Sequence, residues 1–232
     1  MNPFDKYQNL QTTQTDNLGR WYGTVEQPLM YPGVTSILGE TLRNKWEGKD
    51  PKNMEEAAVR GTAIHSLFEE ELKQTPGLQP VSPEYTDTVN SFKQWVAVKK
   101  VKPIYHENKV VSTKYGFAGQ IDLIAEVAGK VTVVDYKTGF EYDNKWGLQV
   151  AAYHLAVAEI LNMNPKDLGF GILHIPFRNP KAFKWLPFTH YEWLQRGFLA
   201  ALELYKHQPR FTELKKMNWP YLFKPAIEKK ET

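Results

Sequence analysis

Apolar residues recur at helical spacing in four parts of the chain. The first part runs to Lys73, and Asn53 and Glu56 form a predicted capping box at its start. A second helix is predicted to begin at Ser82-Pro83, a third to span about 144–162, and a fourth to run from the capping box Thr189–Glu192 to about 207. The inner faces of the first two helices carry Ala57, Gly61, Ile64, Phe68, Leu72, Tyr85, Val89, Phe92 and Val96.

Short apolar runs between these helices predict strands. Three consecutive strands are expected at about 103–112, 117–127 and 131–138, and Ala128-Gly129-Lys130 predicts a hairpin turn between the last two. A further strand is expected at 168–175, after the third helix, and another at 183–188. A strand–helix–strand connection joins parallel strands, whereas the consecutive strands before it should be antiparallel. The order predicts an α/β fold with a mixed central β-sheet flanked by helices.

The two ends of the chain show weaker patterns. Residues 1–20 are polar and are expected to be loose, whereas 21–38 contains short β-like runs. The segment from Lys215 onward is partly basic and is expected to fray. The 232 residues fit one sizeable domain, which we divide into an N-terminal extension (1–30), a core (31–210) and a C-terminal tail (211–232).

Composition excludes several classes of chemistry. The chain has no cysteine, which rules out disulfides, thiolate zinc sites, iron–sulfur clusters and a cysteine nucleophile. The net charge of +3 is compatible with a nucleic-acid partner without identifying one. The N-terminus is polar, without an apolar signal core, and no stretch approaches the roughly 20 apolar residues of a membrane helix. We therefore expect a cytoplasmic protein with no membrane association.

Two carboxylates and a lysine lie close together in the predicted hairpin. Asp135 and Lys137 project from the same side of their strand, and folding the hairpin brings Asp122 near Asp135. On an exposed strand this pattern would be an ordinary ion pair, and that alternative stays open. Val133 and Val134 instead indicate an interior strand, where unpaired charge is costly. A divalent cation would offset that cost, and Mg²⁺ favours carboxylate oxygens.

Two polar pairs at helical spacing accompany the hairpin. His65 and Glu69 share one helical face, and Gln149 and Tyr153 share another on the helix after the Asp-x-Lys strand. A histidine in such a position is more often a surface or core residue than a ligand. Gln149 and Tyr153 are either a chance pair or hydrogen-bond donors to phosphate or to the carboxylates.

Taken together, the motifs resemble those of a known enzyme family. Gly61-x-x-x-His65, Gly119-x-x-Asp122, Asp135-Tyr-Lys-Thr-Gly139 and Gln149-x-x-x-Tyr153 follow the order and spacing of the RecB-like branch of the PD-(D/E)XK nucleases, over about residues 31–177. The segment Tyr31–Leu38 is similar to one in the mitochondrial genome maintenance exonuclease and its phage relatives, with Gly33 as a small departure. No helicase P-loop is present, so the resemblance implies a stand-alone nuclease domain.

The resemblance implies a role for each motif residue. His65, Asp122 and Asp135 correspond to ligands of Mg²⁺ or Mn²⁺, and the Tyr136 carbonyl is a further ligand. Lys137 corresponds to the catalytic lysine. Gln149 and Tyr153 match the accessory motif of the family. The expected enzyme is therefore a metal-dependent deoxyribonuclease.

Substrate and partners are less closely defined by the sequence. Arg60, Lys114, Lys145 and Trp146 flank the motifs and are candidates for phosphate contact or base stacking, with solvated charges or a packed ring as the alternative. The favoured function is an exonuclease that prefers single-stranded DNA ends, in replication, recombination or repair. A single-strand-binding or recombination protein is a conceivable partner. An endonuclease on branched or duplex DNA and a non-catalytic nucleic-acid-binding module remain open.

Overall fold

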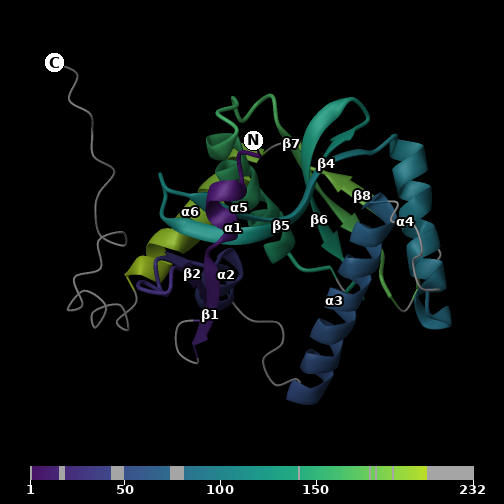
Figure 1. The fold of residues 1–232 in the computed structure, drawn as a ribbon, viewed down its shortest axis with the longest axis horizontal. Helices are drawn as coiled ribbons and strands as arrows, with labels where there is room; N and C mark the ends of the chain where they lie inside the picture. Colours follow the sequence, from purple (N-terminus) through teal and green to yellow (C-terminus); the bar gives the residue numbers. More distant parts are fainter. Residues whose placement is uncertain are drawn as a thin grey trace.

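A five-stranded mixed sheet forms the centre of the molecule (Figure 1). The computed structural model describes residues 2–15, 19–42, 50–73, 81–140, 142–177, 179–180, 182–189 and 191–207. Strands lie in the sheet in chain order. They are β4 (Lys102–Ser112), β5 (Phe117–Val127), β6 (Lys130–Lys137), β7 (Gly169–His174) and β8 (Lys184–Pro187).

The direction of the strands follows the predicted connections. β4, β5 and β6 are antiparallel neighbours, β7 runs parallel to β6, and β8 is antiparallel to β7. The β5–β6 turn has only two residues, Ala128 and Gly129, and both have positive φ (50° and 85°), as a type I′ hairpin turn requires. Helix α5 (Lys145–Ile160) fills the connection from β6 to β7. The predicted hairpin and the mixed α/β fold are confirmed.

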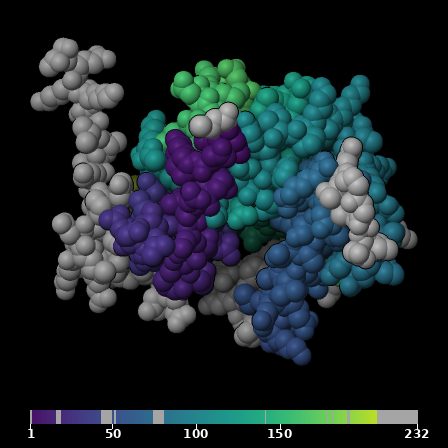
Figure 2. All heavy atoms as spheres, viewed as in Figure 1, coloured from purple at the N-terminus to yellow at the C-terminus, as the bar shows by residue number. Residues whose placement is uncertain are grey.

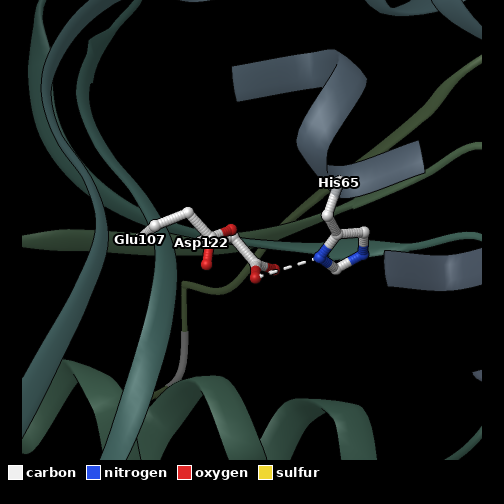
Figure 3. A group of neighbouring side chains, drawn as sticks. All are labelled: His65, Glu107 and Asp122. Atoms are coloured by element: carbon white, nitrogen blue, oxygen red, sulfur yellow. Dashed lines mark ion pairs between the residues drawn. The ribbon is translucent and has the colours of Figure 1, made fainter. Parts of the chain in front are cut away.

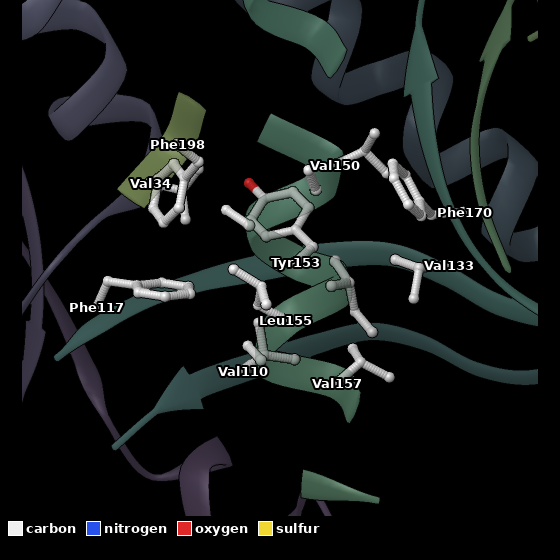
Figure 4. Close-up of a cluster of buried hydrophobic side chains, with 14 of the residues drawn as sticks. Val34, Val110, Phe117, Val133, Val150, Tyr153, Leu155, Val157, Phe170 and Phe198 are labelled. Carbon is white, nitrogen blue, oxygen red and sulfur yellow. The ribbon is translucent and has the colours of Figure 1, made fainter. Parts of the chain in front are cut away.

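Helices cover both faces of the sheet. On one face, α5 and α6 (Tyr191–Lys206) enclose an apolar cluster that includes Val133, Phe170, Val150 and Phe198 (Figure 4). On the other face, α3 (Pro51–Lys73) and α4 (Thr86–Lys99), which follows a short 3₁₀ turn at Pro83–Tyr85, enclose a second cluster. That second cluster includes Ile64, Phe68, Phe92, Leu123 and Val134. The strands are therefore buried on both sides, which explains their continuous apolar runs.

The N-terminal part is structured, and the expectation that residues 1–20 are loose is wrong for most of them. It contains α1 (Asp5–Gln8), followed by β1 (Gln11–Thr15), β2 (Gly19–Gly23) and β3 (Tyr31–Pro32), which form a small antiparallel sheet. Lys109 of β4 anchors the segment, since its Nζ donates to the carbonyls of Gln8 and Leu10 at 3.0 and 2.7 Å. β1 is mostly exposed and polar, so it carries no apolar pattern.

Several helix boundaries also differ from the predictions. The helix predicted to start with an Asn53–Glu56 capping box begins instead at Pro51, and the Asp50 carboxylate accepts a hydrogen bond from the Lys52 N–H at 3.0 Å. Helix α2 (Val34–Thr41) was not predicted. The second capping box includes His190, which lies outside the described residues, as does the predicted tail 211–232. No helix in the described ranges is both long and apolar enough to span a bilayer.

The same substitution at two glycines is expected to have opposite effects on stability. A Cβ at Gly119 of β5 would lie 2.5 Å from the Tyr153 ring, whereas one at Gly39 of α2 would meet nothing within 4 Å. Gly119→Ala should lower the free energy of unfolding by about 1–3 kcal/mol through overpacking. Gly39→Ala should raise it by up to about 1 kcal/mol through helix propensity. Urea unfolding measures both, and a Gly119→Ala protein as stable as the wild type would contradict the packing described.

Candidate metal and catalytic site

The site lies where β5 and β6 separate. Their ladder of paired residues ends at Leu123 and Val134, so Asp122 and Asp135 are the first residues beyond it. At that point Asp122 Oδ2 accepts a hydrogen bond from the Tyr136 N–H at 2.6 Å. A side-chain carboxylate thus takes the place of a strand carbonyl as the acceptor. The strands part without leaving that buried N–H unsatisfied.

His65 reaches the gap from helix α3 (Figure 3). Its Nδ1 lies 3.2 Å from Asp122 Oδ1, and its ring packs edge-on against Tyr136, with 5.5 Å between ring centroids. Burial lowers the pKa of His65, but the neighbouring Asp122 outweighs this, so the net pKa is raised. Burial raises the pKa of Asp122, but His65, Lys137 and the Tyr136 N–H together lower it. The two side chains therefore stabilise each other as an ion pair.

Glu107 is a third acidic neighbour, from β4. The pairs His106–Leu123 and Asn108–Ile121 flank it, which places Glu107 opposite Asp122. One ligand atom each from His65, Glu107 and Asp122 lies within 4.8 Å of the others. Glu107 has a φ of 50°, uncommon for a non-glycine residue within a strand, and its Oε2 accepts a hydrogen bond from Gln120 at 2.6 Å. Burial and the nearby Asp122 raise its pKa.

Glu107 was not predicted as a site residue. This glutamate lies within a predicted strand and belongs to no recognised motif. Only the register of the β4–β5 hairpin brings it opposite Asp122. The one feature that could have indicated Glu107 is a carboxylate within a predicted strand that pairs with the strand of the Gly119-x-x-Asp122 motif.

Asp135 and Lys137 lie on the same side of β6, as predicted. Lys137 Nζ lies 2.7 Å from Asp135 Oδ2 and donates to Gln149 Oε1 at 3.0 Å. Gln149 Nε2 in turn donates to Asp135 Oδ1 at 3.2 Å and to the Tyr153 hydroxyl at 3.0 Å. The helical pair Gln149 and Tyr153 therefore contacts the charged strand directly.

Asp135 is the most deeply buried carboxylate of the group. Its pKa is raised to about 6, because burial and the nearby Asp122, which raise the pKa, outweigh Lys137, which lowers it. Its Oδ2 is buried and accepts no hydrogen bond within the described part of the chain, and its near neighbour is the Lys137 ammonium, with which it forms an ion pair. Buried carboxylate oxygens with spare acceptor capacity, next to an imidazole, fit a hard divalent cation.

The structure brings together seven of the residues singled out by the motifs. They are His65, Asp122, Asp135, Tyr136, Lys137, Gln149 and Tyr153. The side chain of Tyr136 points to the opposite face, where its ring packs against Phe68 and Phe92. Tyr136 therefore contributes to the site through its N–H, which donates to Asp122, and through its ring, which packs edge-on against His65.

The four candidate substrate contacts lie in different surroundings. The Arg60 guanidinium lies over the Phe177 ring, 4.7 Å from its centroid, and neighbouring Gly61 approaches Thr138. Lys145 Nζ donates to the Leu42 carbonyl at 3.1 Å.

The other two candidates are also occupied by local contacts. Trp146 is buried, with its ring 5.0 Å from those of both Tyr142 and His174. Lys114 lies over Tyr115 in the turn before β5. The five residue steps along β5 from Phe117 to Asp122 span about 17 Å, so this turn is far from the carboxylates. Arg60 shares helix α3 with His65, and α3 borders a hollow in the surface (Figure 2).

Comparison with known proteins places this geometry in a family. Residues 83–217 match the PD-(D/E)XK nuclease superfamily, a range that includes Glu107, Asp122, Asp135, Lys137, Gln149 and Tyr153 and begins after His65. No curated protein sequence matches the chain. A solved structure from Eubacterium rectale, provisionally described as an exonuclease, shares 14% identity over 81% of this chain and 82% of its own, with a TM-score of 0.47. A likeness at this level identifies neither substrate nor activity.

The family match spans more than half of the chain and includes the strand pair on which the carboxylates lie. The mixed sheet flanked by helices agrees with the fold of that family. The chain belongs to the PD-(D/E)XK nuclease superfamily.

Proposed function

We propose that this chain is a metal-dependent DNA exonuclease that hydrolyses phosphodiester bonds and prefers single-stranded ends. Membership of the nuclease superfamily supports hydrolysis of nucleic acid. The observation that carries the proposal is the cluster of His65, Glu107 and Asp122 beside the Asp135–Lys137 pair. Within the superfamily, the ordered motifs favour the RecB-like branch, near the mitochondrial genome maintenance exonuclease and its phage relatives.

Five groups would hold the cation. They are the side chains of His65, Glu107, Asp122 and Asp135 and the carbonyl of Tyr136. Three of them already have ligand atoms close together, and Asp135 supplies a buried oxygen with acceptor capacity. The carboxylates suit Mg²⁺, and the imidazole makes Mn²⁺ equally acceptable. When bound, such a cation polarises a phosphate oxygen and lowers the pKa of a coordinated water.

Lys137 is proposed as the catalytic lysine. Its side chain is 18% exposed whereas that of Asp135 is 3% exposed, so the ammonium is the accessible side of the pair. From this position the ammonium orients the attacking water or neutralises charge on the phosphate, whereas the neutral amine would deprotonate the water. The Gln149 Oε1 accepts a hydrogen bond from one of the three N–H groups of Lys137 and so fixes the direction of the ammonium.

Gln149 and Tyr153 are proposed to position the charged groups. Gln149 bridges Lys137 and Asp135, and the Tyr153 hydroxyl accepts the other hydrogen bond of the Gln149 amide. Tyr153 is buried and packs closely over Gly119, so its hydroxyl has little freedom to move. Arg60 is proposed to contact phosphate, and Lys114, Lys145 and Trp146 remain weaker candidates for substrate contact.

Two other functions fit parts of the same site. An endonuclease on branched or duplex DNA would use identical chemistry and differ only in how the substrate enters. A non-catalytic nucleic-acid-binding module would have no need for one buried and two half-buried carboxylates beside a lysine, since removing such charges from water is costly. The retained charges favour an enzyme.

Asp135→Asn should stabilise the metal-free protein at neutral pH. Because folding raises the pKa of Asp135 to about 6, the folded state binds more protons than the unfolded state between about pH 4 and 6. The contribution of Asp135 to stability is therefore fully present below pH 4 and is lost as the pH rises through 6. The asparagine variant should melt higher than the wild type at pH 7 in EDTA, by about 2–4 °C for each kcal/mol gained. Equal melting temperatures at pH 7 would show that the buried charge is not costly.

Digestion of end-labelled linear DNA tests the activity itself. With Mg²⁺ or Mn²⁺ the wild type should degrade it, and Asp135→Ala and Lys137→Ala should each lose at least about 100-fold in turnover, the usual scale for acid–base groups. Lys102→Ala is the matched control, because this strand lysine is exposed and pairs only with Glu126 on the surface. Closed circular single strands should survive.

Each alternative gives a different result. Equal turnover by the wild type and both active-site variants would refute catalysis at this site. Cleavage of the circular strand would favour the endonuclease, and salt-dependent binding without any turnover would favour the binding module.

A further inference from the structure

The loop that follows the catalytic strand is fixed at both ends. At its start, the Thr138 carbonyl accepts from the Phe177 N–H at 3.0 Å, and the Gly139 carbonyl lies 2.7 Å from His174 Nε2. At its end, the Asp143 carboxylate accepts from the Lys145 N–H at 2.9 Å. The position of the loop relative to Lys137 is thus set by hydrogen bonds to β7 and α5.

This fixed loop exposes aromatic rings. Among the described residues, three large aromatic side chains are strongly exposed: Phe140 (65%), Tyr142 (49%) and Trp193 (58%). Two of the three lie in this short loop. Tyr142 packs on Trp146, with ring centroids 5.0 Å apart, whereas Phe140 is more exposed than Tyr142. An exposed phenyl ring on a backbone anchored beside a charged site is well suited to bind a planar apolar group.

Phe140 is within reach of a substrate held at Lys137. Three peptide units separate the two residues, so their Cα atoms are at most about 11 Å apart. A single strand of DNA presents phosphates and unstacked bases side by side. A phosphate at the Lys137 site therefore leaves a neighbouring base within reach of Phe140, and stacking on an aromatic ring accepts any base.

We propose that Phe140 is a base-stacking residue that binds single-stranded DNA next to the scissile phosphate. This inference rests on the proposed function, because it takes the Lys137 site as the place where phosphate binds. It assigns the preference for single strands to Phe140, in the segment that follows β6. Bases in a duplex are paired and stacked on each other, so they are not free to stack on Phe140.

Equilibrium binding in EDTA, which removes the cation needed for turnover and keeps Lys137 in place, tests the proposal. Fluorescence anisotropy would follow a short labelled oligothymidylate, and an abasic strand of equal length and charge would serve as the second ligand. Phe140→Ala and Phe140→Leu should weaken binding of the oligothymidylate about 5- to 150-fold, since stacking one base is worth about 1–3 kcal/mol. Phe140→Tyr should bind like Phe140. None of the three substitutions should change binding of the abasic strand.

The controls separate this inference from the proposed function. Phe140 is exposed, so its removal should leave folding intact, and Val98→Ala on α4, at 59% exposure, controls for loss of surface apolar area. Unchanged oligothymidylate affinity in Phe140→Ala, with a wild type that digests DNA, would overturn the stacking role and leave the exonuclease proposal standing. Equal weakening on the abasic strand would also overturn it. A wild type that neither binds nor digests DNA would overturn both.

Discussion

The separation of β5 from β6 beyond the pair Leu123–Val134 is the constraint on which the site depends. Where the strands part, the buried Tyr136 N–H has no strand carbonyl to bond, and leaving it unsatisfied would be costly. The Asp122 carboxylate meets that need. Once Asp122 is fixed there, His65 from one face of the sheet and Asp135 from the other side of the gap become its neighbours.

The gap between β5 and β6 also explains how side chains from both faces of the sheet reach the same site. His65 belongs to α3, which packs on the cluster containing Phe68 and Val134. Gln149 belongs to α5, which covers the opposite cluster. If the β5–β6 ladder were continuous, the strands would separate the side chains of these two helices. Burying the charged side chains costs free energy, and the packing of the two apolar clusters offsets that cost.

The site residues that could be predicted from the sequence are those whose positions follow from local patterns along the chain. Asp122, Asp135 and Lys137 were found because a two-residue turn and strand alternation fix their relation within one hairpin. Gln149 and Tyr153 were found because helical spacing is local. Glu107 was missed because its position follows from pairing across a second hairpin whose register the sequence pattern does not reveal. Short β-like runs were expected in 21–38, where β3 and most of β2 lie, but β1 was missed because this exposed, polar edge strand has no apolar alternation.

The account rests on a cation site formed in the gap between β5 and β6, and a crystal structure with Mn²⁺ tests it most directly. Anomalous scattering should place one or two ions in the gap, in contact with oxygens of Asp122 and Asp135 and with the His65 imidazole, at roughly 2.0–2.3 Å. Glu107 should be a ligand or be linked through a bound water. Mn²⁺ elsewhere in the molecule, with Asp135 still paired to Lys137 and His65 to Asp122, would contradict it.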